Sequence, residues 1–160
     1  MTSPSDPNDD RPNRLPWPPI LDLGVLAAAW LLGSVIPLDI LPTDMVTRVG
    51  GWLVFAVGIS IAVAGIGYFK RIGTPVNPTG RAAQLATGGV YAWTRNPMYL
   101  GTVIAFVGLA LARNSAWLLI LTAALPFALF KLAIAREEAY LTRRFGPAYA
   151  AYRAKVRRWL

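Results

Sequence analysis

The chain contains four apolar stretches, and the second of them, at residues 49–69, runs for 21 residues without a charged side chain. The hydrocarbon core of a bilayer is about 30 Å thick and takes about 20 helical residues to cross. Residues 116–135 also meet this length, whereas residues 20–36 are marginal and residues 99–112 are short. Only 15% of all residues are charged and 55% are apolar, against about 25% and about 45–50% in soluble domains. The sequence therefore predicts an integral membrane protein.

We expect an all-α fold with four transmembrane helices, at about residues 20–36, 49–69, 99–112 and 116–135. Only Arg113, Asn114 and Ser115 separate the third stretch from the fourth, so these two helices are predicted to form a hairpin. Residues 20–160 are predicted to form a single domain. The segment before it, residues 1–19, is rich in Pro, Asp, Asn and Ser and is predicted to be a disordered tail.

Proline and glycine residues within the apolar stretches predict how the helices bend and pack. Pro126 is expected to kink the fourth helix. Small residues let transmembrane helices approach each other closely. We therefore interpret the glycines of the second and third stretches as helix-packing positions rather than as a phosphate-binding loop: Gly58, Gly65, Gly67, Gly101 and Gly108.

Basic residues are concentrated on one side of the predicted bundle. With four spans, the N-terminal tail, the connector at residues 70–98 and the tail after residue 135 share one side and hold 13 of the 16 Lys and Arg residues. Because basic loops stay in the cytoplasm, both termini are predicted to be cytoplasmic, and a bacterial inner membrane is the expected location. This asymmetry accounts for the net charge of +8, so contact with membrane lipid is expected and a nucleic-acid partner is not.

The chain has no Cys and no His, which excludes several kinds of chemistry. A Ser-His-Asp triad and His-ligated haem need His, and disulfide frameworks and thiolate zinc sites need Cys. No metal site is predicted. Any reaction must use carboxylates, Arg, Tyr, Asn and a cofactor taken from outside.

The connector ends in Arg95, Asn96 and Pro97, immediately before the third apolar stretch. Asn is a preferred N-cap residue and Pro fits the first position of a helix. An Arg beside the free N–H groups of a helix N-terminus can bind an anion. The alternative is that Arg95 meets a lipid phosphate and that the two residues after it only cap the helix.

Glu137 and Glu138 are the only acidic residues after Asp44. We expect them at the C-terminal end of the fourth helix, where acidic side chains oppose the helix dipole. They are predicted to face a cation or to accept hydrogen bonds from amino or hydroxyl groups; the alternative is an ion pair with Arg136, Lys131 or the basic tail. Adjacent helical residues point about 100° apart, so both carboxylates cannot face one small ligand equally.

The last residues are predicted to form a further helix after a break at Gly146 and Pro147. Tyr149, Tyr152, Val156 and Trp159 recur at helical spacing, with basic residues on the other faces. This pattern is typical of a C-terminal amphipathic helix at the membrane interface. The alternative is a lid over a site, with a Tyr side chain reaching inward.

Several sequence runs resemble the signature of the isoprenylcysteine carboxyl methyltransferase-like and phospholipid methyltransferase families. They are TPVNP at residues 74–78, LATGGVY at 85–91 and TRNPMYLG at 94–101, followed by REE at 136–138. Leu141, Phe145, Gly146, Tyr149 and Tyr152 complete the resemblance, which covers residues 70–160. Asn96 stands where isoprenylcysteine enzymes usually have His, and in this respect the chain looks more like the bacterial branch.

This resemblance implies a membrane-embedded methyltransferase with S-adenosylmethionine as methyl donor. It also implies a lipophilic small molecule, a lipid or a lipidated molecule as acceptor, with a carboxylate, thiol or amine as the methylated group. The implied cofactor-binding residues are Tyr91, Arg95, Asn96, Pro97, Tyr99, Gly101, Glu137 and Glu138, and the implied catalytic residues are Arg95, Asn96 and Glu138. The alternatives are a non-catalytic membrane bundle or transporter subunit and an NADPH-dependent membrane reductase.

Overall fold

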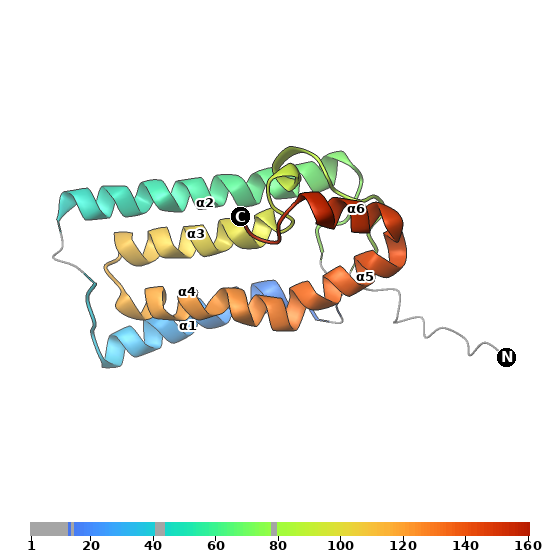
Figure 1. Ribbon diagram of the computed structural model, residues 1–160. Coiled ribbons are helices and arrows are strands. Elements are labelled where there is room, and N and C mark those ends of the chain that lie inside the picture. Colours follow the sequence, from blue (N-terminus) through green and yellow to red (C-terminus); the bar gives the residue numbers. More distant parts are fainter. Residues whose placement is uncertain (1–12, 14, 41–43, 78–79) are drawn as a thin grey trace.

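The structure, a computed structural model, describes residues 13, 15–40, 44–77 and 80–160. In these residues α1 (Trp17–Val35) and α2 (Met45–Arg71) precede a connector with the short helix η1 (Gly89–Ala92). The chain continues as α3 (Pro97–Ala112), α4 (Ala116–Leu129), η2 (Phe130–Ile134), α5 (Ala135–Phe145) and α6 (Pro147–Lys155). Figure 1 shows α2 beside α3 and α1 beside α4, with α5, α6 and the connector gathered at one end. The prediction of an all-α fold is confirmed for the described residues.

Three helical segments of the described chain are long and apolar enough to cross a bilayer: Trp17–Val35, Met45–Arg71 and Ala116–Phe145. Helix α3 is apolar but has only 16 residues, a length of about 24 Å at about 1.5 Å per residue. The protein is thus an integral membrane protein by its apolar helices, and the count of four spans stays a prediction.

Helix α1 begins at Trp17, inside the segment that the sequence predicts to be a disordered tail. Pro18 and Pro19 fit here because the first turn of a helix needs no N–H donors. Residues 1–12 and 14, to which most of that prediction refers, lie outside the described residues.

Glycines bring α2 and α3 into backbone contact. A Cβ atom at Gly58 would overlap the backbone of Ala105, and one at Gly108 would overlap the backbone of Phe55. Gly101 also faces α2, because a Cβ there would lie 2.6 Å from the carbonyl oxygen of Gly58. These positions are helix-packing residues, as predicted. The prediction is wrong for Gly67, because a Cβ atom there would meet no atom of another helix within 4 Å in the described structure.

The contrast between Gly58 and Gly67 gives a matched test on one helix. Gly58→Val should destabilise the bundle by at least about 1–3 kcal/mol, because overpacking forces the neighbouring backbone to move. Gly67→Val should leave stability nearly unchanged. Thermal unfolding of both variants in the same detergent measures the difference, and equal melting temperatures would contradict the close contact between α2 and α3.

The predicted hairpin between α3 and α4 is confirmed. Asn114 adopts a left-handed backbone conformation with φ of 51°, and its Oδ1 accepts a hydrogen bond of 3.0 Å from the backbone N–H of Ile40. Ser115 is the N-cap of α4 and accepts a 3.3 Å hydrogen bond from the backbone N–H of Leu118. The turn therefore holds the hairpin and the chain after α1 together.

The helix of the fourth apolar stretch does not end with that stretch near residue 135, because helical structure continues through Ala116–Phe145. Pro126 lies within α4, and a π-helical turn follows at Phe130–Ile134. Prolines and π turns are two common causes of a bend in a helix. Glu137 and Glu138 then lie in the first turn of α5. Our expectation that they end a helix and oppose its dipole is therefore wrong.

Helix α6 forms where the sequence predicts it, but its apolar face contacts protein. Tyr149, Tyr152 and Val156 are buried and form a cluster with Leu85 of the connector and with apolar side chains of α5. This contact contradicts an apolar face immersed among lipid headgroups and agrees with the alternative of a lid. The segment after α6 also folds back, since Trp159 packs against a core cluster that includes Phe106.

Candidate functional site

A cavity of about 490 Å³ lies at the end of the bundle where α5, α6 and the connector meet. Its walls come from α1, the end of α2, the connector, the start of α3, α5 and α6. Small-molecule sites commonly measure about 300–1,000 Å³ and combine apolar walls with a few polar groups. The volume is therefore sufficient for a ligand of nucleoside size.

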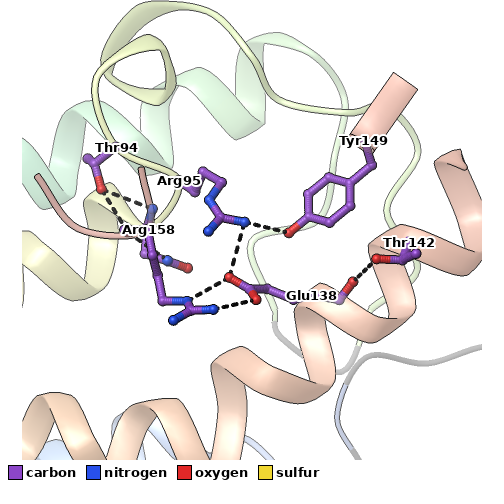
Figure 2. A network of polar contacts seen from close by, with 7 residues as sticks. Thr94, Arg95, Glu138, Thr142, Tyr149 and Arg158 are labelled. Atoms are coloured by element: carbon purple, nitrogen blue, oxygen red, sulfur yellow. Dashed lines mark hydrogen bonds and ion pairs between the residues drawn. The ribbon is translucent and has the colours of Figure 1, made fainter. Parts of the chain in front are cut away.

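Arg95 and Glu138 meet in this cavity, although 42 positions separate them in the sequence. Arg95 Nη1 lies 3.2 Å from Glu138 Oε1, and their side chains are only 10% and 12% exposed. Arg158 donates two hydrogen bonds to the same carboxylate, of 2.8 Å from Nε and 2.9 Å from Nη2. Figure 2 shows the carboxylate between the two guanidinium groups. The structure thus brings together Arg95 and Glu138, two of the residues that the family resemblance implies for the site.

Arg95 keeps unused hydrogen-bonding capacity in this arrangement. Its Nη1 also lies 3.5 Å from the hydroxyl oxygen of Tyr149, while its Nε is buried and has no hydrogen-bond partner. A buried N–H without a partner costs free energy. Two guanidinium groups and one carboxylate also leave a net charge of +1 on the three side chains. Both features suit an anionic ligand group.

Backbone contacts with the C-terminal segment position Arg95 and Asn96. The backbone N–H of Arg95 donates to the carbonyl of Arg157 at 3.0 Å. Asn96 Nδ2 and Thr94 Oγ1 both donate to the carbonyl of Arg158, at 2.9 and 3.1 Å. Asn96 thus occupies the N-cap position of α3 but makes no side-chain cap. The predicted capping bond is replaced by a bond to the tail.

Glu137 faces a different set of partners from Glu138. Its Oε1 accepts a 2.6 Å hydrogen bond from the hydroxyl of Tyr99 and a 3.1 Å hydrogen bond from Asn13 Nδ2. Both glutamates line the cavity. The adjacent carboxylates therefore form two separate polar positions in one cavity, as their angular separation on a helix requires.

Tyr91 is 4% exposed, and its ring stacks on Phe69 with centroids 5.0 Å apart. Its backbone carbonyl accepts a 2.7 Å hydrogen bond from the hydroxyl of Tyr152, while its own hydroxyl is buried without a partner. Burial, followed by the proximity of Tyr152 and Glu137, raises the pKa of Tyr91. The phenol is therefore neutral near pH 7 and can donate a hydrogen bond to a ligand in the cavity.

Comparison with known proteins identifies the family. The family model described as phospholipid methyltransferase matches residues 46–148, which is more than half of the chain. The chain belongs to the phospholipid methyltransferase family. The match runs from the start of α2 into α6, so this family region includes Arg95, Glu137 and Glu138 and excludes α1 and the segment after α6.

Two curated proteins resemble parts of this phospholipid methyltransferase family member. The protein-S-isoprenylcysteine O-methyltransferase of Schizosaccharomyces pombe is 36% identical over 72 residues, which are 45% of this chain and 30% of that protein. An uncharacterized protein of Haemophilus influenzae is 42% identical over 65 residues, 39% of this chain and 100% of that protein. The chain therefore covers less than a third of the yeast enzyme's length. No solved structure matches the chain significantly.

The cavity of this family member includes most of the residues singled out in the sequence. Its lining contains Tyr91, Arg95, Asn96, Pro97, Tyr99, Glu137 and Glu138. Gly101 does not belong to the lining, because it faces α2 in the helix contact described above. In the described residues no group of three or more His, Cys, Asp and Glu side chains could hold a metal ion.

Sequence reasoning missed three polar residues at the site: Asn13, Asp22 and Arg158. Asp22 lines the cavity from α1 and has a buried Oδ1 without a partner. One signal could have revealed it, since Asp22 is the only charged residue in the first apolar stretch and ionisable residues inside membrane helices usually have a function. Asn13 and Arg158 lie outside the resembling motifs, and no local pattern distinguishes them.

Proposed function

We propose that this chain is a membrane-embedded methyltransferase that uses S-adenosylmethionine and acts on a lipophilic acceptor. The observation that carries the proposal is the Arg95 guanidinium, which is buried beside Glu138 in a 490 Å³ cavity and has an unpartnered Nε. The family match supports methyl transfer as the reaction class. The S. pombe relative, named for methylation of an isoprenylcysteine protein, supports a lipid-linked acceptor.

The residues present fit the polar groups of S-adenosylmethionine, which carries a carboxylate, an ammonium group, a sulfonium and ribose hydroxyls. Arg95 would bind the carboxylate, because the surrounding cluster has a positive excess. The Glu137 carboxylate would accept hydrogen bonds from the ammonium group or the ribose, and the free hydroxyl of Tyr91 adds a donor. Glu138 orients Arg95 through their ion pair, and Asn96 orients the tail through its bond to Arg158.

When bound, S-adenosylmethionine supplies an electrophilic methyl group on its sulfonium. This chain contributes positioning and exclusion of water, which lower the barrier for displacement at carbon without a strong general base. The apolar cavity walls strengthen the charged contacts because the local dielectric constant is low. Arg95, Asn96 and Glu138 are therefore proposed as the residues on which the reaction depends most.

Two acidic residues of the cavity favour an amine as the methylated group of the acceptor, among the carboxylate, thiol and amine considered above. Asp22 and Glu137 both line the cavity, and a carboxylate acceptor would be repelled by them. A protonated amine is attracted and must lose its proton before it attacks the methyl carbon. Asp22 Oδ1, buried without a partner, is suited to receive that proton. Acceptor and α1 can meet within the bilayer, since α1 is an apolar helix of spanning length.

The places where the charged segments gather support an orientation of the protein in the membrane. Asn13 contacts Glu137 of α5, and Arg157 and Arg158 contact residues 94–96, so both described ends lie at the end of the bundle where α5 and the connector meet. These segments carry most of the basic residues, which stay in the cytoplasm. We therefore propose that the cavity and both termini face the cytoplasm, in a bacterial inner membrane.

Ligand protection tests the proposed function. S-Adenosylhomocysteine should raise the melting temperature of the purified protein in detergent, because a ligand at 100 times its Kd stabilises the folded state by about 2.7 kcal/mol. NADPH at the same concentration should have no effect. Protection by NADPH alone would support a membrane reductase, and protection by neither ligand would support a non-catalytic bundle or transporter subunit.

A further inference from the structure

Arg158 is held at the candidate site by both its side chain and its backbone. Its guanidinium donates two hydrogen bonds to Glu138 and lies over the ring of Phe130, with Cζ 4.6 Å from the centroid. Its carbonyl accepts hydrogen bonds from Thr94 and Asn96. Such a fixed arginine, located after α6 and beyond the region that the family model matches, requires an explanation of its own.

The charges of the cluster suggest what Arg158 does. Arg–carboxylate pairs prefer a two-bonded geometry, and here Arg158 takes up that geometry while Arg95 makes a single contact with Glu138. If Arg158 were absent, Glu138 could form the two-bonded pair with Arg95. Arg95 would then be neutralised by Glu138, and the pair would no longer attract an incoming anion. The hydrogen bonds to Glu138 raise the pKa of Arg158, so it stays charged.

We propose that Arg158 is a positioning residue that neutralises Glu138 and thereby keeps Arg95 available for the carboxylate of the methyl donor. The inference rests on the proposed function, since it assigns Arg95 to the donor. It adds a determinant of donor affinity from outside the family region. Arg158 itself need not touch the donor.

A simpler role for Arg158 is a fastening role, in which its contacts hold the segment after α6 in place. The two roles predict different effects of a substitution at Glu138. A fastening role affects any ligand of the cavity, whereas charge compensation affects ligands that carry a carboxylate. S-Adenosylhomocysteine has the amino-acid carboxylate, and methylthioadenosine has the same nucleoside without it. Replacing Glu138 by Gln removes the negative charge, so compensation by Arg158 is no longer required.

The experiment measures the Kd of both ligands by calorimetry in detergent for the wild type, Arg158→Ala, Glu138→Gln and the double variant. Arg158→Ala should weaken S-adenosylhomocysteine binding about tenfold or more, as expected for removal of a close charge, and leave methylthioadenosine binding unchanged. In the Glu138→Gln background, the same substitution should change S-adenosylhomocysteine binding less than about twofold. Lys155→Ala, an exposed charge removal at the end of α6, is the matched control and should bind like the wild type.

Two controls show whether a loss of binding reflects a folding defect. They are the Arg158→Gln variant and the melting temperatures of all variants without ligand. The Gln side chain keeps a hydrogen-bond donor but has no charge, so it should reproduce the effect of Arg158→Ala in a folded protein. Equal losses for both ligands, or a loss that persists in the Glu138→Gln background, would overturn the inference in favour of a fastening role. Unchanged binding in both Arg158 variants would overturn it as well. Failure of the wild type to bind S-adenosylhomocysteine would instead refute the proposed function.

Discussion

Replacing Arg95 with alanine should weaken S-adenosylhomocysteine binding about 100-fold or more, since loss of one partner of a buried charged pair costs about 2–5 kcal/mol or more. The side chain is 10% exposed, so its interactions are largely shielded from water. Arg95→Lys should also bind poorly, because an ammonium group lacks the planar fork that pairs with carboxylates. Calorimetry in detergent gives the Kd values.

Arg143→Ala is the matched control for Arg95→Ala. Arg143 is an exposed residue on α5, so its removal changes the net charge equally without altering the cavity. The control should bind S-adenosylhomocysteine as the wild type does. If Arg95→Ala bound as tightly as Arg143→Ala, the donor carboxylate would have to bind elsewhere, and the proposed role of Arg95 would be wrong.

Replacing Asp22 with asparagine should reduce methylation of an amine about 100-fold or more, which is the scale of a lost acid–base group. Asn has nearly the same shape as Asp but cannot receive the proton. The test follows methyl transfer from labelled S-adenosylmethionine to dodecylamine, dodecanoate and dodecanethiol, which share one apolar chain. The wild type is expected to methylate dodecylamine in preference to the other two.

Asp39→Asn is the control for the Asp22 substitution, because Asp39 is exposed and does not line the cavity. It should leave methylation of dodecylamine unchanged. The binding of S-adenosylhomocysteine should be the same in both variants, because Asp22 is assigned to the acceptor. Preferential methylation of dodecanoate by the wild type would contradict an amine acceptor and leave the methyltransferase proposal intact.

The features that the sequence predicts well depend on local physical chemistry. Uninterrupted apolar runs predict the helices, and the three residues between α3 and α4 leave room only for a turn. Gly58 and Gly108 predict a close helix contact, because a residue without a side chain lets the backbone of another helix approach. The family resemblance implies a shared site for Arg95, just before α3, and Glu138, on the helical segment that continues α4, and the two side chains are in contact. These inferences use only the local sequence and the arrangement of one helical hairpin.

The features that the sequence does not predict depend on long-range contacts. The charged residues after Ala135 suggest the end of a membrane span, and only the tertiary structure shows that the helix continues. An amphipathic pattern at Tyr149 and Tyr152 does not say whether lipid or protein covers the apolar face. The positions of Asn13 and Arg158 depend on how the chain ends fold back, which no periodicity encodes.

In a regular helix, the length of the apolar part would fix the direction of the side chains that follow it. The π turn at Phe130–Ile134 makes these two properties independent. A π turn holds one residue more than an α-helical turn, and one residue corresponds to a rotation of about 100°. The direction in which Glu137 and Glu138 point is therefore adjusted by this turn, independently of the apolar length of α4. The length of the membrane-spanning part and the direction of the acidic side chains can therefore vary separately within one continuous helical segment.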